Sequence, residues 1–294
     1  MGVETKVNRN ISSSFRRVAA IVSTTSLLAV GTVFNTTSSS AAAMHSGTVE
    51  VLSAGSLSNI MLLVESAFKS DTGYSVQDVS EGSSAIASGV VAKTLQGDVF
   101  LSASITANVA LEGTSHGNWI NGYTRFGASP TVLAYYPKSR FATSLTRRPW
   151  YNVIRSSGFE LGRTNPAVDP GGVLDIDALY GIGYAYNIPS LLRLARDARN
   201  VYTEEAIPGL LQAGQLDAAF MYAVSAHAAR LPFVPLTGTK SLDAHYTIAR
   251  LNRAPHPTAA AAFVKWLLSD TGLSLMERQG LVPVAPPDFV AAPK

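Results

Sequence analysis

The stretch from Val49 to Leu57 constrains the fold of this chain more than any other part of its sequence. Residues 49–52 show the alternating apolar pattern of a short strand, small residues then allow a sharp turn, and apolar side chains recur at helical spacing as far as Phe68. The pattern predicts a strand, a tight turn and a helix with Ser56 as its N-cap. Such a turn brings free backbone N–H groups, the positive end of a helix dipole and a hydroxyl to one point, which is the outline of an anion site.

The rest of the chain repeats this alternation. Further strands are expected at Tyr74–Val79, Asp98–Leu101, Thr131–Tyr136, Ala218–Ala223, 233–236, 245–250 and Leu281–Val284. Further helices are expected at 85–91, 153–156, Val173–Tyr186, Ser190–Arg199, Ala206–Gln212, Thr258–Leu268 and Gly272–Gln279. Alternating strands and helices are typical of an α/β fold with a parallel sheet, in which ligands bind beyond the carboxyl ends of the strands. Gly73 is expected to end the first helix, and the proline-rich tail from Pro286 is expected to be loose.

Two more predicted helices begin in a way that exposes their first N–H groups. Ser83 and Ser84 follow Gly82, and Pro170 with Gly171–Gly172 precedes the helix from Val173. Either serine is also explained as a plain N-cap. The recurrence of such turns at equivalent places favours a shared anion site, in which uncharged donors would bind a fully ionised oxyanion.

The charge of the chain is concentrated at its N-terminus. Residues 1–43 hold four Lys and Arg against one Glu and so account for the whole formal charge of +3. The remainder has no net charge, and neither a nucleic-acid partner nor an acidic membrane surface is predicted for it. The chain has no cysteine, which excludes disulfides, thiolate metal sites and a cysteine nucleophile.

The N-terminal segment has the pattern of a secretory signal. Arg16–Arg17 precede a mostly apolar run over Val18–Val33, and Ala41–Ala43 supply small residues for cleavage after Ala43. An uncleaved membrane anchor is the alternative, but the run is shorter than the roughly 20 residues that a bilayer span prefers. We therefore predict a periplasmic or extracellular protein with residues 1–43 as the signal peptide.

No catalytic constellation is visible, and we predict that the chain is not an enzyme. It has no His-Glu-x-x-His pair, no Gly-x-Ser-x-Gly elbow and no Gly-x-x-x-x-Gly-Lys loop. The scattered histidines, expected to be incidental, are His45, His116, His227, His245 and His256. Asp169 could act as a general base, but no partner is apparent. Arg193, Arg196 and Arg199 are expected to form a solvated helix face.

From Thr48 to Pro283 the sequence resembles the secreted molybdate/tungstate-binding components of ABC importers, which have the type II periplasmic-binding-protein fold. The resemblance is carried by Ala54–Leu57, Gly82–Ala87, Asp98–Ala103, Gly162–Gly171 and, more weakly, Gly214–Tyr222. It implies an α/β fold of two lobes, each a mainly parallel sheet flanked by helices. Lobe one would comprise residues 47–130 and 240–294, and lobe two residues 131–239. Crossovers near Ala128–Thr131 and Leu236–Ser241 would form a hinge.

The resemblance also implies a binding site between the lobes. Ser56 and Ser83 match two serine ligands, Gly171 a backbone donor, Glu204 a helix-start N–H and Tyr222 a tyrosine whose hydroxyl closes the site. Archaeal-type relatives add two carboxylates that complete an octahedral metal shell. Asp169 fits one of them, whereas Met221 stands where the second is expected before the tyrosine. We therefore expect a tetrahedral oxyanion held by hydrogen bonds, with Asp169 as a ligand or a structural residue.

The implied ligand is molybdate or tungstate, with no other cofactor and no free metal cation, and the implied partner is a membrane permease. The protein is expected to be a monomer. Sulfate, phosphate and ferric ion remain alternative ligands. A ferric site usually needs paired tyrosines, histidine and carboxylates, and Tyr222 alone beside Met221 argues against it. A secreted hydrolase using Ser56 or Ser83 is a second alternative, and it would need a base beside the serine. A sensory or scaffold protein with the same fold is a third.

Overall fold

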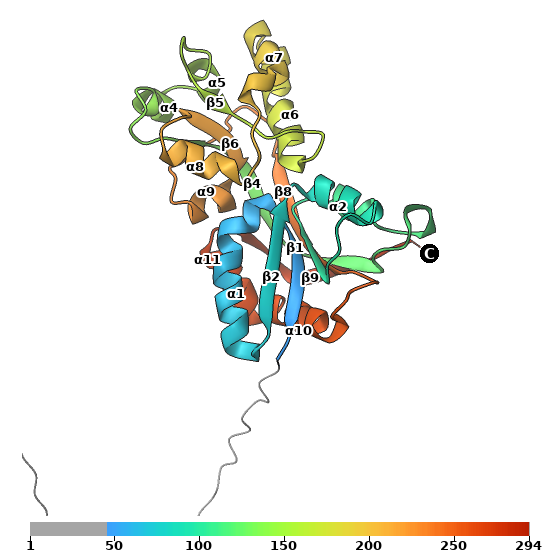
Figure 1. Cartoon of the computed structure of the whole chain (residues 1–294). Coiled ribbons are helices and arrows are strands. Elements are labelled where there is room, and N and C mark those ends of the chain that lie inside the picture. The colour runs from blue at the N-terminus through green and yellow to red at the C-terminus, as the bar shows by residue number, and fades with distance from the viewer. Residues whose placement is uncertain (1–45, 294) are drawn as a thin grey trace, which may run out of the picture. The chain divides into compact units, whose positions relative to one another are not determined.

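The computed structural model describes residues 46–293, and its strands form a mixed sheet in the order β2-β1-β3-β8-β4-β6-β5, with β7 and β9 also paired to β4 (Figure 1). The strands are β1 (Thr48–Ala54), β2 (Ser75–Glu81), β3 (Val99–Ser102), β4 (Gly122–Tyr135), β5 (Leu161–Gly162), β6 (Ala218–Tyr222), β7 (Phe233–Pro235), β8 (Asp243–Arg250) and β9 (Val282–Ala291). The predicted signal segment, residues 1–43, lies outside the described residues.

The helices join these strands. The α-helices are α1 (Ser58–Thr72), α2 (Ser83–Val91), α3 (Ile105–Val109), α4 (Ala142–Arg147), α5 (Trp150–Val153), α6 (Pro170–Ala185), α7 (Pro189–Arg196), α8 (Ala206–Gln212), α9 (Ala223–Ala228), α10 (Pro257–Leu267) and α11 (Asp270–Arg278). Short 3-10 turns are η1 (Gly55–Leu57), η2 (Thr114–His116) and η3 (Ala198–Asn200). In the described part of the chain, no helix has the length and apolar character needed to cross a membrane.

The expectation of mainly parallel sheets was wrong. β1 pairs in parallel with β2 and β3, as the βαβ pattern predicted, and β5 pairs in parallel with β6. β8 pairs antiparallel with β3 and β4, and β4 pairs antiparallel with β6, β7 and β9. The sequence alternation reveals crossovers between neighbouring parallel strands, but it does not reveal which distant strand returns beside them in the opposite direction.

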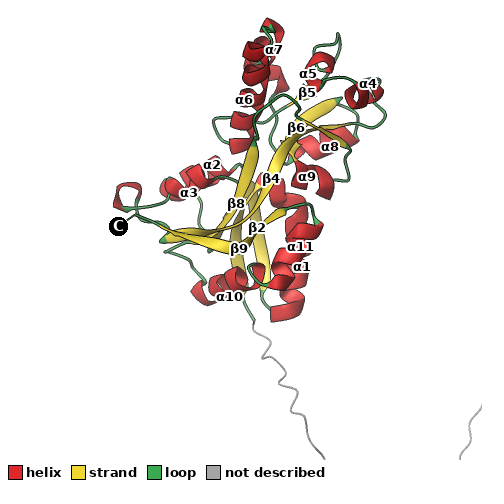
Figure 2. Ribbon diagram, turned by 180° about the vertical axis from the view of Figure 1, so that it is seen from behind, coloured by secondary structure: helices red, strands yellow, loops and turns green. Residues whose placement is uncertain are grey.

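Strand β4 connects the two halves of the sheet. Residues 122–130 pair with β8 and β9, and residues 131–135 pair with β6 and β7. Figure 2 shows β4 and β8 continuing from one group of helices to the other. The sequence predicted a strand from Thr131 onward, and the first half was missed because glycines and Pro130 interrupt its apolar pattern. The predicted crossover at Ala128–Thr131 is therefore part of one long strand.

Two groups of apolar side chains fill the two halves. In the first, Phe68 of α1 packs edge-on against Phe263 and Trp266 of α10, with ring centroids 5.1 Å and 5.5 Å apart. In the second, Trp150 packs edge-on against Phe220 of β6 at 5.6 Å. Burial of these rings contributes much of the stability of each half.

The C-terminal tail is not loose, contrary to our expectation. Val282–Ala291 forms β9, which pairs with β4 on either side of a register shift between Arg125 and Gly127. Pro286 and Pro287 fall at this interruption, between the paired residues Pro283 and Asp288, where the ladder requires no N–H donor. Arg125 also forms an ion pair with Asp288.

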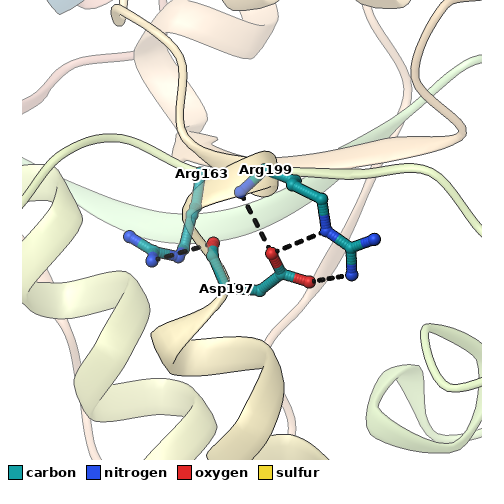
Figure 3. A network of polar contacts seen from close by, with 3 residues as sticks. All are labelled: Arg163, Asp197 and Arg199. Carbon is teal, nitrogen blue, oxygen red and sulfur yellow. Dashed lines mark hydrogen bonds and ion pairs between the residues drawn. The ribbon is translucent and has the colours of Figure 1, made fainter.

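Hydrogen bonds to the last carbonyls stabilise the ends of α1 and α7. Gly73 ends α1 in the left-handed region (φ 84°), as predicted, and its N–H donates to the carbonyl of Lys69. In the other half of the protein, the buried Arg163 guanidinium donates to the carbonyls of Ala195 and Asp197 at the end of α7 (Figure 3). The Asp197 carboxylate accepts hydrogen bonds from the backbone and side chain of Arg199. Arg193, Arg196 and Arg199 are exposed, as predicted.

Candidate functional site

The predicted serine ligands lie at the carboxyl ends of their strands, but neither caps a helix. Ser56 lies in η1 directly after β1 and is buried. Its Oγ accepts a hydrogen bond from the Tyr246 hydroxyl at 2.9 Å, and its N–H donates to the Glu204 carboxyl. The N-cap of α1 is Leu57, without a side-chain hydrogen bond, so the N-cap expected at Ser56 was wrong.

Ser83 has an equivalent environment. It is the first residue of α2, whose N-cap is Gly82, and its buried Oγ accepts a hydrogen bond from the N–H of Ala103 at 3.1 Å. The alternative explanation of Ser83 as a plain N-cap was therefore wrong. In both serines the side-chain oxygen accepts one hydrogen bond from a fixed donor, so each hydroxyl proton remains available to a ligand.

The loop before α6 approaches these serines closely. The N–H of Ala85 in α2 donates to the carbonyl of Val168 at 3.0 Å, and a Cβ added to Gly82 would overlap that carbonyl oxygen. Glycine at position 82 is what permits this backbone approach. The contact brings the start of α2 beside Asp169 and Gly171.

Asp169 is the N-cap of α6, and Pro170 occupies the first position of the helix. The Asp169 Oδ1 accepts the N–H of Gly171 at 2.7 Å, so this predicted backbone donor is bonded to an internal carboxyl. A Cβ built on Gly171 would lie 3.1 Å from Asp169 Oδ1, 3.3 Å from Thr164 Oγ1 and 3.4 Å from the Tyr222 hydroxyl. A carboxyl and two hydroxyls thus converge above this glycine.

Tyr222, at the end of β6, is buried with its hydroxyl inside the site. That hydroxyl has no hydrogen-bond partner among the described residues. A buried polar group without a partner costs about 1–3 kcal/mol, and this hydroxyl is free to bond to a ligand that enters the candidate site. Its neighbour Met221 packs with apolar residues such as Val132 and supplies no carboxylate.

The second carboxyl comes from Glu204 instead. We expected this residue to contribute a backbone N–H, whereas the structure directs its buried side chain to the Ser56 N–H and to Asp169. Glu205 lies alongside, since a Cβ on Gly55 would overlap its Oε1 and lie 3.1 Å from Glu204 Oε2. The spacing of Glu204 before Tyr222 identified the position, but it did not identify the group that points inward.

Burial controls the charge of these acids. Burial and, to a smaller extent, the negative charge of Glu205 raise the pKa of Asp169 to about 6, although hydrogen bonds from Gly171 and with Glu204 oppose the shift. Burial and the charges of Asp169 and Glu205 raise the pKa of Glu204 well above its usual range. Burial likewise raises the pKa of Tyr222, so its phenol is neutral and can donate.

Sequence reasoning missed Asp175 and Tyr246. Asp175, in the second turn of α6, is fully buried, accepts the N–H of Thr164 at 3.1 Å and has its pKa raised well above the usual range by burial. An aspartate within an otherwise apolar helix was the available signal. Tyr246, in β8, lies in no motif of the sequence, and nothing local marks it as a site residue.

A separate cluster of ionisable groups has a structural role. Within residues 46–293, the group of three His, Asp or Glu side chains whose ligand atoms all lie within 4.8 Å is Glu50, Asp98 and His256. The Asp98 carboxylate already accepts the N–H groups of Glu50 and His256 and pairs with His256 Nδ1. It therefore joins β1 to the start of α10.

The fold and this buried polar site define an extracytoplasmic binding protein with the α/β periplasmic-binding-protein fold. The sequence profile of the bacterial extracellular solute-binding protein family matches residues 49–282, and the chain belongs to this family. It is thus a non-enzymatic component of ABC transport that acts outside the cytoplasm, as predicted, and the serine-hydrolase alternative was wrong.

Three relatives illustrate the range of similarity. An uncharacterized solute-binding protein of Petrotoga mobilis is 27% identical over 83% of this chain and 86% of its own length. The molybdate/tungstate-binding protein WtpA of Pyrococcus abyssi is 22% identical over 58% of this chain and 64% of its own. The solved periplasmic molybdate-binding protein of Azotobacter vinelandii superposes with a TM-score of 0.63 at 15% identity, covering 80% of this chain and 98% of that one.

Proposed function

We propose that this protein captures molybdate or tungstate and delivers it to the membrane permease of an ABC importer. One observation carries the proposal. Two buried carboxyls, Asp169 and Glu204, lie beside the hydroxyl and N–H of Ser56 and the hydroxyl of Tyr222. The donors suit an oxyanion, and the carboxyls distinguish between oxyanions.

The distinction follows from the central atom of the anion. Molybdenum and tungsten in their tetrahedral oxyanions can accept further oxygen ligands, so the oxygens of Asp169 and Glu204 could complete a six-oxygen shell. Sulfur and phosphorus in sulfate and phosphate do not expand in this way. For these anions a buried carboxylate adds repulsion, which is strong in a site of low dielectric.

The small cavity bounded by Gly171, Glu204 and Tyr222 has a volume of about 10 Å³, roughly the room for one water. The Glu204 carboxyl accepts the Ser56 N–H, so an oxyanion that takes this donor would displace the carboxyl, whose oxygen would then be available to the metal centre. We thus propose Glu204 as the second carboxylate, in place of the one expected at position 221, where the chain has Met221.

Two lobes remain our proposal for the mechanism. Residues 47–130 with 240–294 would supply Ser56 and Ser83, and residues 131–239 would supply Asp169, Glu204 and Tyr222. A ligand that contacts both sets stabilises the closed arrangement. β4 and β8, which continue between the two halves, would carry the hinge.

Hydrogen phosphate is the second candidate, because its proton could be donated to the Asp169 carboxylate. Ferric ion has some support from the two buried phenols, Tyr222 and Tyr246, whose rings pack edge-on at 6.3 Å. The Tyr246 hydroxyl, however, donates to Ser56, which removes it as a simple metal ligand.

Isothermal titration of residues 44–294 near neutral pH with molybdate, tungstate, sulfate, phosphate and ferric citrate tests these ligands. We expect tight binding of the first two. The double variant Asp169→Asn with Glu204→Gln should weaken molybdate binding and strengthen sulfate binding, because the carboxylate ligands and the repulsion are lost together. Asp177→Asn, an exposed position on the same helix, is the matched control. Preferential binding of sulfate or phosphate by the wild-type protein would overturn the ligand assignment.

A further inference from the structure

Tyr246 is a fully buried side chain on β8 that contacts two proposed ligand residues at once. Its hydroxyl donates to Ser56 Oγ at 2.9 Å, and its ring packs edge-on against Tyr222 with centroids 6.3 Å apart. The ring of Phe126 also lies beside it, with centroids 6.4 Å apart. The phenol is thus held in place by two neighbouring rings, and its polar end is directed into the site.

The direction of this hydrogen bond determines what Ser56 can do. A serine hydroxyl has one proton and can accept hydrogen bonds at its oxygen. Burial and the charge of Glu204 raise the pKa of Tyr246 well above its usual range, so the phenol keeps its proton and acts as a donor. Because the Ser56 oxygen accepts from Tyr246, the Ser56 proton is directed to another acceptor.

The same arrangement recurs at Ser83, where the donor is the backbone N–H of Ala103. Both serine hydroxyls are therefore oriented as donors, one by a main-chain group and one by a side chain. The side-chain case can be altered by removing a single oxygen atom.

We propose that Tyr246 is a positioning residue that fixes the Ser56 hydroxyl as a donor, so that the site favours anions whose oxygens all accept hydrogen bonds. This inference rests on the proposed function of oxyanion capture. A hydroxyl without this constraint could also accept a hydrogen bond from the P–OH group of hydrogen phosphate, and it would discriminate less between the two kinds of anion.

A double-mutant cycle between Tyr246 and Ser56 tests the proposal, with molybdate and inorganic phosphate as titrants. Tyr246→Phe keeps the ring and removes the donor, and we expect molybdate affinity to fall about five- to tenfold, the usual effect of one hydrogen bond. In the Ser56→Ala background the same change should have almost no further effect. The ratio of molybdate to phosphate affinity should also fall in Tyr246→Phe.

Tyr123→Phe is the control, since Tyr123 is a buried tyrosine of β4 in a different apolar cluster. Urea unfolding of each variant checks that it is folded. If Tyr246→Phe lowers molybdate affinity equally in the wild-type and Ser56→Ala backgrounds, the effect is a general one of packing, and the positioning role is overturned. No loss from Tyr246→Phe, while Ser56→Ala weakens binding, would overturn this inference and leave the proposed function intact. A wild-type protein that binds no oxyanion would overturn both.

Discussion

Asp169→Asn should stabilise this protein at neutral pH while it impairs ligand binding. Asp169 is 4% exposed, and burial is the largest cause of its raised pKa. Asparagine has nearly the same shape and is an equally good N-cap, so its side-chain oxygen can still accept the N–H of Gly171. The substitution therefore removes the charge and retains the start of α6.

The magnitude follows from the pKa of the carboxyl in the folded and unfolded protein. The ordinary value is 3.8 and the folded value is about 6, so the folded protein holds the proton more tightly. Below both values the carboxyl is neutral in either state and no penalty arises. As pH rises through this interval the unfolding free energy decreases, and above it the loss reaches about 3 kcal/mol.

Urea unfolding at about pH 4 and about pH 8 measures this effect. We expect Asp169→Asn to exceed the wild type by less than about 1 kcal/mol at the lower pH and by up to about 3 kcal/mol at the higher pH. The variant should also gain stability through Glu204, because removal of the Asp169 charge removes one cause of the raised pKa of Glu204. Asp177→Asn should show no comparable difference between the two pH values. A variant that is less stable than the wild type at pH 8 would refute the reasoning.

Two further predictions concern binding. Gly82→Ala places a methyl group against the Val168 carbonyl and should weaken molybdate binding at least about tenfold. The control is Gly181→Ala, in open space on α6, which should leave binding unchanged and add up to about 1 kcal/mol to the unfolding free energy. Equal molybdate affinities of Gly82→Ala and the wild type, measured by titration, would contradict this prediction. Because a carboxylate must be ionised to coordinate the metal centre, binding below about pH 6 displaces the proton of Asp169, so affinity should rise by up to about tenfold per pH unit on account of this residue. Glu204, whose pKa is raised well above its usual range, should extend the rise beyond pH 6. An affinity that falls as pH rises above 6 would show that the carboxyl must be protonated.

Local signals in the sequence predicted the local structure well. Residues 49–103 follow the predicted order of strands and helices, and Gly73 ends α1 in the left-handed conformation. Long-range pairing was not predictable in the same way, because the direction of β8 beside β3 depends on contacts between residues about 150 positions apart. The tail from Pro286 was misjudged for a related reason, since its prolines are tolerated opposite an irregularity in a distant strand.

The site shows the same limit on a smaller scale. Ser56, Ser83, Asp169, Glu204 and Tyr222 were predicted as ligand residues from the resemblance, and the structure places them near one another. The group that each residue directs inward was not predictable: Glu204 presents its carboxyl, and the N–H of Gly171 is bonded to Asp169. Spacing fixes the position of a residue along an element, whereas the orientation of a side chain depends on what other elements place beside it.

A site for an anion that contains buried carboxyls is unfavourable for the unliganded protein, and this cost is what would give it selectivity. A set of neutral donors binds sulfate and molybdate by the same hydrogen bonds and separates them mainly by size. In their ionised forms Asp169 and Glu204 would repel any anion whose central atom cannot accept their oxygens, and they would coordinate one that can. Discrimination of this kind combines attraction for the proper ligand with repulsion of its competitor. Under the proposed function, the stability that Asp169→Asn should restore is the cost, in the unliganded protein, of keeping a buried carboxyl that would repel sulfate.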